Sequence, residues 1–224
     1  MGSTIHRLCR SRLGNGTAGG CMGQAERSAM TRAAAEKIGE LFDILRIDYR
    51  DDHNTRDTPG RVARMLVDEI LRGRYDAPPH ITDFDNAEAF DQLIVTGPIE
   101  LRSTCAHHLM PIYGHAFVGA LPSADGRIIG LSKYDRVVDH FAARLQIQEE
   151  LVKQIGQHLV EATAPRGLAV RISAVHMCRT HRGVRASHRG RMVNSAYYGE
   201  LAADRSLQGQ FLQECVALER GAAA

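Results

Sequence analysis

The chain has 224 residues, with 28 Lys+Arg against 26 Asp+Glu and a formal net charge of +2. Hydrophobic residues make up 44% and charged residues 24%, as in ordinary globular proteins. This length suits one large domain or two small ones. No run approaches the ~18 apolar residues of a membrane helix. These values exclude a membrane-spanning, a collagen-like or a wholly disordered chain.

The first part of the chain combines a tail with helical patterns. Residues 1–24 are rich in Gly, Ser and Arg and predict a flexible basic tail. Apolar residues recur at helical spacing from about residue 25 to 45, and a polar loop covers 48–57. Thr58-Pro59 then predicts a helix start, with Thr58 as the cap, and Gly73 its end.

The period changes to that of strands after residue 91. We expect strands over 92–104, 114–121, 127–131, 168–178 and near 190–198, and helices over 132–141, 148–162 and 204–218. Asp125-Gly126 predicts a hairpin turn, and Ser132 an N-cap. This order indicates an α+β protein with an antiparallel sheet.

Four segments follow from these patterns. They are a flexible basic tail over 1–24, an N-terminal helical region over 25–90, a domain with the predicted sheet over 91–218 and a C-terminal tail over 219–224.

The five cysteines are an odd number, and no apolar signal segment opens the chain. A chain this long, with its own core, does not need a disulfide framework. We therefore expect a reduced, cytoplasmic protein whose cysteines are buried, incidental or metal-binding.

Two short clusters of Cys and His stand out. Cys105 and His108 are three residues apart on a predicted turn and could bind one metal ion, which leaves His107 free for proton transfer. His176 and Cys178 end the alternating strand and would share one face. Either cluster alone equally suits a buried Cys beside a satisfied core His. Together they favour one catalytic zinc site.

An acid-free segment follows the second cluster. Residues 176–191 hold five arginines, namely Arg179, Arg182, Arg185, Arg189 and Arg191. They could form a solvated loop, a nucleic-acid patch or a cradle for polyphosphate. Few aromatic residues and no Trp weaken a single-stranded nucleic-acid platform.

Two helix starts offer further polar groups. Ser132, Lys133 and Arg136 lie where a helix N-terminus favours anions, although an ordinary capped helix would look the same. Gln148 and Glu149 open the next helix, where such residues usually complement the dipole. A buried Glu there could instead accept from the N1–H and 2-amino group of guanine.

Several ordered motifs together resemble GTP cyclohydrolase I. They are Cys105-x-His107-His108, Gly130-Leu131-Ser132-Lys133-x-x-Arg136, Gln146-x-Gln148-Glu149 and His176-x-Cys178 with Arg182-Gly183, preceded by the helix start at Thr58-Pro59-Gly60-Arg61. The resemblance covers roughly residues 30–217.

The resemblance implies a role for each matching residue. Cys105, His108 and Cys178 would bind Zn²⁺, and His107 and His176 would transfer protons. Ser132 and Glu149, with Gln148 near, would hold guanine. The triphosphate would be bound by basic residues, namely Lys133, Arg136, Arg182, Arg61 and Arg64.

The family also implies a fold and a reaction. The fold would be the tunnelling fold, an antiparallel sheet with helices on one face that closes into a barrel in a homodecamer, with active sites between subunits. The reaction opens the imidazole ring of GTP at C8, releases formate and recloses to 7,8-dihydroneopterin triphosphate. No nucleic-acid or membrane partner is implied.

Position 106 departs from the family pattern. The family has Cys-Glu-His-His, whereas this chain has Ala106 in place of the glutamate. A specialised member could stop at a formamidopyrimidine or use another purine nucleotide. A zinc-stabilised nucleic-acid-binding protein is the alternative from another class.

Overall fold

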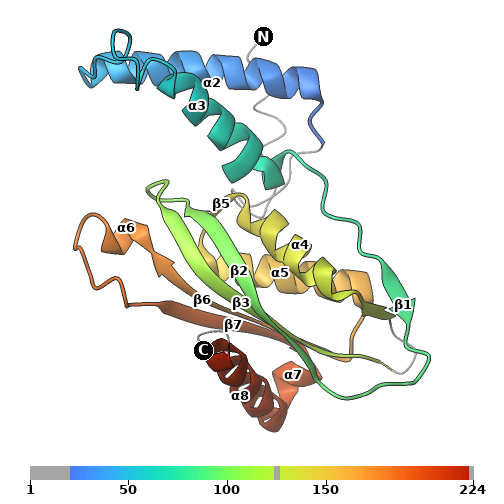
Figure 1. Cartoon of the computed structure of the whole chain (residues 1–224). Coiled ribbons are helices and arrows are strands. Elements are labelled where there is room, and N and C mark those ends of the chain that lie inside the picture. Colours follow the sequence, from blue (N-terminus) through green and yellow to red (C-terminus); the bar gives the residue numbers. More distant parts are fainter. Residues whose placement is uncertain (1–20, 124–126, 222–224) are drawn as a thin grey trace. The chain divides into compact units, whose positions relative to one another are not determined.

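The structure is a computed structural model that describes residues 21–123 and 127–221. Most of the predicted tail and the Asp125-Gly126 turn therefore lie outside the described residues. The chain divides into two compact units, Met1–Ala77 and Pro78–Ala224 (Figure 1). Residues 78–90 belong to the second unit, where their strand β1 pairs with β4.

The first unit is a helical hairpin. It contains α2 (Gln24–Ile44), α3 (Thr58–Arg64), the π-helix η2 (Met65–Ile70) and the 3-10 helix η3 (Arg72–Arg74). The predicted cap was wrong by one residue, because Asp57 holds the N-cap position and Thr58 is already helical. Pro59 accordingly lies in the first turn, where its missing N–H costs nothing.

The second unit is built on a five-stranded sheet in the order β5-β2-β3-β6-β7. Its strands are β2 (Ile94–Cys105), β3 (Pro111–Leu121), β5 (Leu145–Gln146), β6 (Gly167–His176) and β7 (Met192–Gly199). Neighbours pair antiparallel, except that β5 runs parallel to β2. The predicted α+β class with an antiparallel sheet is confirmed.

A second, two-stranded sheet was not predicted. It pairs β1 (Asp83–Asp85) with β4 (Arg127–Ile129), so β4 does not form the expected hairpin with β3. Arg127 donates to Asp83 at 3.0 Å and to Asp85 at 2.8 Å across the two strands.

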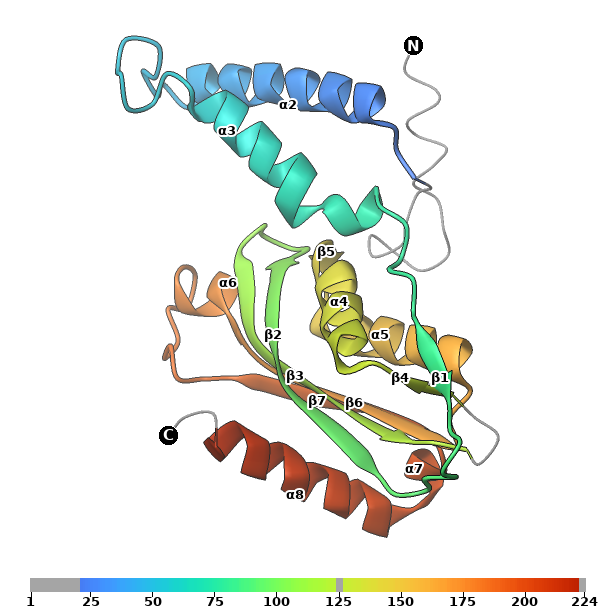
Figure 2. The ribbon, with the colours of Figure 1, turned by 45° about the vertical axis from the view of Figure 1, so that its right-hand side comes forward.

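Helices cover both faces of the larger sheet (Figure 2). They are α4 (Leu131–Ala142), α5 (Gln148–Thr163), α6 (Met177–Thr180), α7 (Glu200–Ala203) and α8 (Arg205–Gly221). The expectation of helices on one face holds for α4 and α5, while α8 packs on the opposite face through Phe211 and Cys215. Ser132 is not the N-cap of α4, because that position belongs to Gly130.

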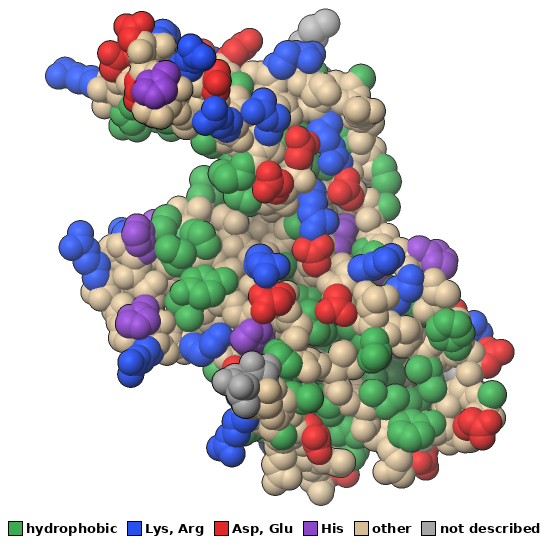
Figure 3. Space-filling view, in the orientation of Figure 1, with side chains coloured by type: hydrophobic (Ala, Val, Ile, Leu, Met, Phe, Trp, Pro, Cys, Tyr) green, Lys and Arg blue, Asp and Glu red, His purple; other side chains and the backbone are tan. Residues whose placement is uncertain are grey.

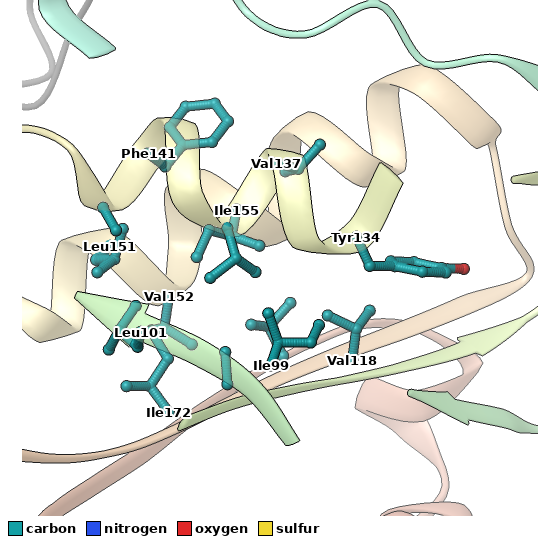
Figure 4. Packing of buried hydrophobic residues seen from close by; sticks show 14 of the residues in the cluster. Ile99, Leu101, Val118, Tyr134, Val137, Phe141, Leu151, Val152, Ile155 and Ile172 are labelled. Carbon is teal, nitrogen blue, oxygen red and sulfur yellow. The ribbon is translucent and has the colours of Figure 1, made fainter. Parts of the chain in front are cut away.

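The main core lies between the sheet and the helices α4 and α5 (Figure 4). Alternate residues of β6, including Val170 and Ile172, point to this side, as their period of two predicted. They contact Val137 of α4 and Ile155 of α5. Each of these two residues belongs to the apolar face of its own amphipathic helix. The opposite residues, such as Phe117 of β3, pack under α8. Both faces of the central strands are thus held rigidly.

Two further properties bear on the sequence predictions. The cysteines of the described segments, Cys21, Cys105, Cys178 and Cys215, are all free thiols. Burial raises the pKa of the Cys215 thiol to about 12, which disfavours the reactive thiolate. Within the described segments, no helix is long and apolar enough to cross a membrane.

Gly114 provides a test of the sheet packing. A Cβ at this position would lie 2.1 Å from the Ser173 carbonyl oxygen and 2.7 Å from the Ala174 Cα, both backbone atoms that cannot move aside. We expect Gly114→Ala to lower the free energy of unfolding by at least about 1–3 kcal/mol, the usual cost of overpacking. Urea unfolding measures the loss.

Gly209 in α8 is the matched control, since a Cβ there meets no atom within 4 Å. Gly209→Ala should raise stability by about 0.5–1 kcal/mol, because alanine has less backbone freedom to lose in a helix. Equal effects of the two substitutions would contradict the packing described.

Candidate metal centre

The strand order explains why the two Cys/His clusters meet. Strand β3 lies between β2 and β6 and is antiparallel to both, so β2 and β6 end at the same edge of the sheet. Cys105 is the last residue of β2 and His176 the last residue of β6. The two strands are separated by two strand spacings, about 10 Å, which side chains can bridge from both sides.

Cys105, His108 and Cys178 form the candidate metal centre. Their ligand atoms all lie within 4.8 Å of one another, and no other such group of His, Cys, Asp or Glu occurs in the segments that the structure describes. Two thiolates bound to one zinc ion at ~2.3 Å lie about 3.8 Å apart in a tetrahedron, so the spacing fits. Two sulfur donors and one imidazole also suit zinc chemically.

A tight turn brings His108 back over Cys105. The backbone N–H of Leu109 donates to the Cys105 carbonyl at 2.9 Å, and the N–H of Cys105 donates to the Met110 carbonyl at 2.8 Å. Leu109 has a positive φ of 54°, which a tight reversal requires. The side chains of His107 and His108 are exposed, whereas Cys105 is buried.

Cys178 reaches the group by a different route from the one predicted. The strand ends at His176, and Cys178 lies in the short helix α6, so the two residues do not continue one strand face. Burial and the adjacent Cys105 thiol raise the pKa of Cys178, while the cation of Arg182 lowers it. Arg182 therefore lies close enough to act on this sulfur.

Two histidines adjoin the ligands without belonging to the group. Nδ1 of His107 lies 3.9 Å from the Cys105 sulfur. Nε2 of His176 lies 2.8 Å from Oε1 of Gln148. Burial lowers the pKa of His176, Glu149 opposes that effect and Arg179 adds to it.

Strand β5 places the start of α5 at the same edge. Its residue Gln146 pairs with Cys105, and its carbonyl accepts from the N–H of Ala106 at 3.0 Å. Helix α5 begins two residues later, so Gln148 is buried and Glu149 exposed beside His176. The short strand β5 was missed because two residues carry no periodic signal.

Asn194 is a polar neighbour that the sequence analysis also missed. It lies on β7, opposite Ile172, and its Oδ1 accepts from Gln148 Nε2 at 2.7 Å. Residues 194, 196 and 198 share one face, and Ala196 and Tyr198 pack against the main core. An asparagine in such a row is unusual for a strand and could have marked it.

The first half of α4 lies apart from this centre within one chain. Ser103, near the end of β2, donates its hydroxyl to the carbonyl of Ala142 at 2.7 Å, so the C-terminal end of α4 is the near end. Ser132 is ten residues from Ala142, about 15 Å along a helix. Ser132 and Lys133 are thus not brought to the metal group by their own chain.

Arg136 lies in a groove of its own. The groove has a volume of about 250 Å³ and is lined by Ile99, Glu100, Arg102, Asp135, Arg136 and Asp139. Arg61 and Arg64 are exposed on α3 of the first unit, where Arg61 pairs with Asp57 at 3.5 Å. The structure therefore groups only part of the predicted triphosphate residues.

Basic side chains gather on the segment that follows the candidate ligand Cys178. Figure 3 shows basic (blue) and His (purple) side chains over α6 and the segment that leads to β7, where every Lys or Arg position is an arginine. The five arginines of this segment are all exposed. The segment is folded, since the N–H of Ala186 donates to the Arg179 carbonyl at 3.1 Å.

Comparisons with known proteins identify the family. The sequence profile of the GTP cyclohydrolase I family matches residues 34–216. GTP cyclohydrolase 1 of Shewanella denitrificans is 42% identical over 78% of this chain and 79% of its own length. That of Mycolicibacterium vanbaalenii is 41% identical over 84% and 89%.

The solved structure of the apo form of the archaeosine synthase QueF-Like matches 48% of this chain and 92% of its own. Its sequence identity is 15% and its TM-score 0.35. The assignment to the α+β class therefore rests on the strand order of this chain alone.

The three ligands predict a measurable affinity. Metal-free protein should bind one zinc ion per chain in competition with a chromophoric chelator. Cys105→Ser and Cys178→Ser should each weaken binding by more than about 100-fold, beyond the effect of an outer-shell substitution. His107→Asn is the control and should keep the affinity within about tenfold. Equal losses in all three variants would contradict the ligand set.

The profile match over most of the chain, and relatives more than 40% identical, agree with the Cys/His centre at the sheet edge. The chain belongs to the GTP cyclohydrolase I family.

Proposed function

We propose that the protein is a zinc-dependent GTP cyclohydrolase I, which converts GTP and water into formate and 7,8-dihydroneopterin triphosphate. The observation that carries this proposal is the grouping of Cys105, His108 and Cys178 with two histidines that the metal would leave unligated. A purely structural zinc site would need neither His107 nor His176.

The three donors would hold zinc with one coordination position open. A bound zinc ion supplies Lewis acidity, which lowers the pKa of water toward about 7. The Cys105 and Cys178 sulfurs and the His108 imidazole would hold the ion, and with it this chemistry, at the strand ends. Hydrolysis then adds water at C8 of guanine, and C8 finally leaves as formate.

The two remaining histidines would move the protons. His176 would protonate N7 of guanine as the imidazole ring opens, and His107 would assist the water and the opening of the ribose. Histidine suits both roles because it gains and loses protons near neutral pH. Burial lowers the pKa of His176, which favours its return to the neutral form after it has accepted a proton.

Glu149 would recognise the base. Its exposed carboxylate at the start of α5 is an acceptor pair for the N1–H and 2-amino group of guanine. Ser132 would assist this recognition. Adenine lacks that donor edge, so this contact favours guanine.

The triphosphate would be bound by residues of more than one chain. Arg182 follows Cys178 by four residues and its charge lowers the pKa of that thiol, but Lys133 and Arg136 lie on the distant half of α4. A second copy that presents its α4 to this edge would complete the site, and Arg61 and Arg64 would add charge. We therefore propose that the protein forms a homo-oligomer, namely a decamer. In it, the outer strands of neighbouring subunits would pair and close the sheets into the barrel of a tunnelling fold. We place this assembly in the cytoplasm.

The product identifies the activity. Protein loaded with one equivalent of zinc should release formate from GTP and give a fluorescent neopterin after oxidation and dephosphorylation. His176→Asn should lower kcat by about 10²–10⁴-fold, the usual contribution of a general acid. Chelator-stripped protein is the control. If the zinc-loaded protein forms no product from GTP, the proposal is refuted.

Ala106 favours a second candidate, a family member with altered output. A carboxylate between a zinc ligand and His107 is missing, which could leave ring opening intact and impair later steps. Such an enzyme would release a formamidopyrimidine or accept another purine nucleotide.

Mass spectrometry separates the two candidates. If position 106 limits the later steps, the opened formamidopyrimidine should accumulate, and Ala106→Glu should shift the ratio toward the pterin. Ala106→Gln is the matched control, because it adds the same bulk without the charge. An unchanged ratio in Ala106→Glu would show that position 106 does not control the output.

A further inference from the structure

The side chain of Gln148 is buried and held by several hydrogen bonds, whereas a residue that binds substrate is accessible. Its side chain is only 1% exposed, so it offers almost no surface to a ligand. It lies at the first turn of α5, over the pair of strands β6 and β7. Its side chain contacts Ile172, Met192, Asn194 and His176 within the described part of the chain.

The orientation of the Gln148 amide follows from its neighbours. Nε2 lies 3.1 Å from the Met192 carbonyl, 3.3 Å from the Ile172 carbonyl and 2.7 Å from Oδ1 of Asn194. The two backbone carbonyls can only accept hydrogen bonds, so the donor end of the amide must face them. A flipped amide would place its oxygen against two carbonyl oxygens.

Asn194 reinforces this orientation. Its own Nδ2 donates to the backbone carbonyl of Gln148 at 3.4 Å, which leaves Oδ1 to accept from the Gln148 side chain. The acceptor oxygen of Gln148 therefore faces Nε2 of His176 at 2.8 Å. An oxygen there requires that His176 Nε2 carry a hydrogen.

We infer that Gln148 is a positioning residue that holds His176 in its Nε2–H tautomer and presents Nδ1 to the substrate. This inference rests on the proposed function, and it replaces a guanine contact by Gln148. A proton that His176 gives to a guanine nitrogen leaves from Nδ1, and Nε2 keeps its hydrogen in the bond to Gln148. The neutral imidazole that remains is already in the correct tautomer to be reprotonated at Nδ1.

Kinetics separate positioning from binding. Gln148→Met keeps the length of the side chain and removes both polar atoms. We expect kcat to fall about 10–100-fold with KM for GTP within twofold, since Gln148 acts through His176. A KM raised tenfold or more with unchanged kcat would assign Gln148 to guanine and overturn the inference.

A double-mutant cycle gives a second criterion. Once His176 is replaced, Gln148 has nothing to position, so Gln148→Met should add less than a twofold loss to the single-turnover rate of His176→Asn. Independent, multiplicative losses would overturn the inference. Gln208→Met is the matched control, because Gln208 is also a buried glutamine that donates to carbonyls, those of Leu201 and Ala202, within α7 and α8. It should lower stability without changing kcat.

The tautomer of His176 can be observed directly. This test needs neither an activity assay nor a variant at Gln148. In ¹⁵N-histidine-labelled protein, the His176 signals, assigned by their loss in His176→Asn, should report a protonated Nε2 and an unprotonated Nδ1 when the ring is neutral. The opposite tautomer would overturn the inference. If zinc-loaded protein releases no product from GTP while the Nε2–H tautomer is found, the proposed function fails and the positioning of His176 stands.

Discussion

The antiparallel placement of β3 between β2 and β6 is the constraint on which the candidate site depends. Because β3 reverses direction, Cys105 and His176 both end strands at one edge, although 70 residues of chain separate them. Strand β5 then adds a parallel pair at Cys105 and delivers α5 to the same place. The candidate metal ligands, the two histidines and the buried amide are therefore brought together by the pairing of strands in one five-stranded sheet.

The longer strands and helices could be predicted from the sequence, because their apolar residues recur with the period of a strand or a helix. The alternation of Val170 and Ile172 defined β6, and the helical spacing of Leu151, Ile155 and Leu159 defined α5. The three metal ligands were proposed from residue chemistry and from family motifs, and their donor atoms do lie together.

The features that escaped prediction depend on tertiary pairing instead of local pattern. Strands β1 and β5 have three and two residues and exist because β4 and β2 pair with them. The helical position of Cys178 follows from the end of β6 at His176, which no period marks. The role of Asn194 depends on a contact across to α5, 46 residues away in the chain.

Strand β7 connects the arginine segment to the residues that surround Gln148. The exposed arginine segment runs directly into β7, whose first residue, Met192, supplies a carbonyl that fixes Gln148, and Asn194 follows two residues later. Because Gln148 in turn contacts His176, one short piece of backbone joins the arginine segment to the surroundings of the imidazole. A change in the backbone where this segment enters β7 would therefore alter the contacts of Gln148 and, through them, the contact to His176.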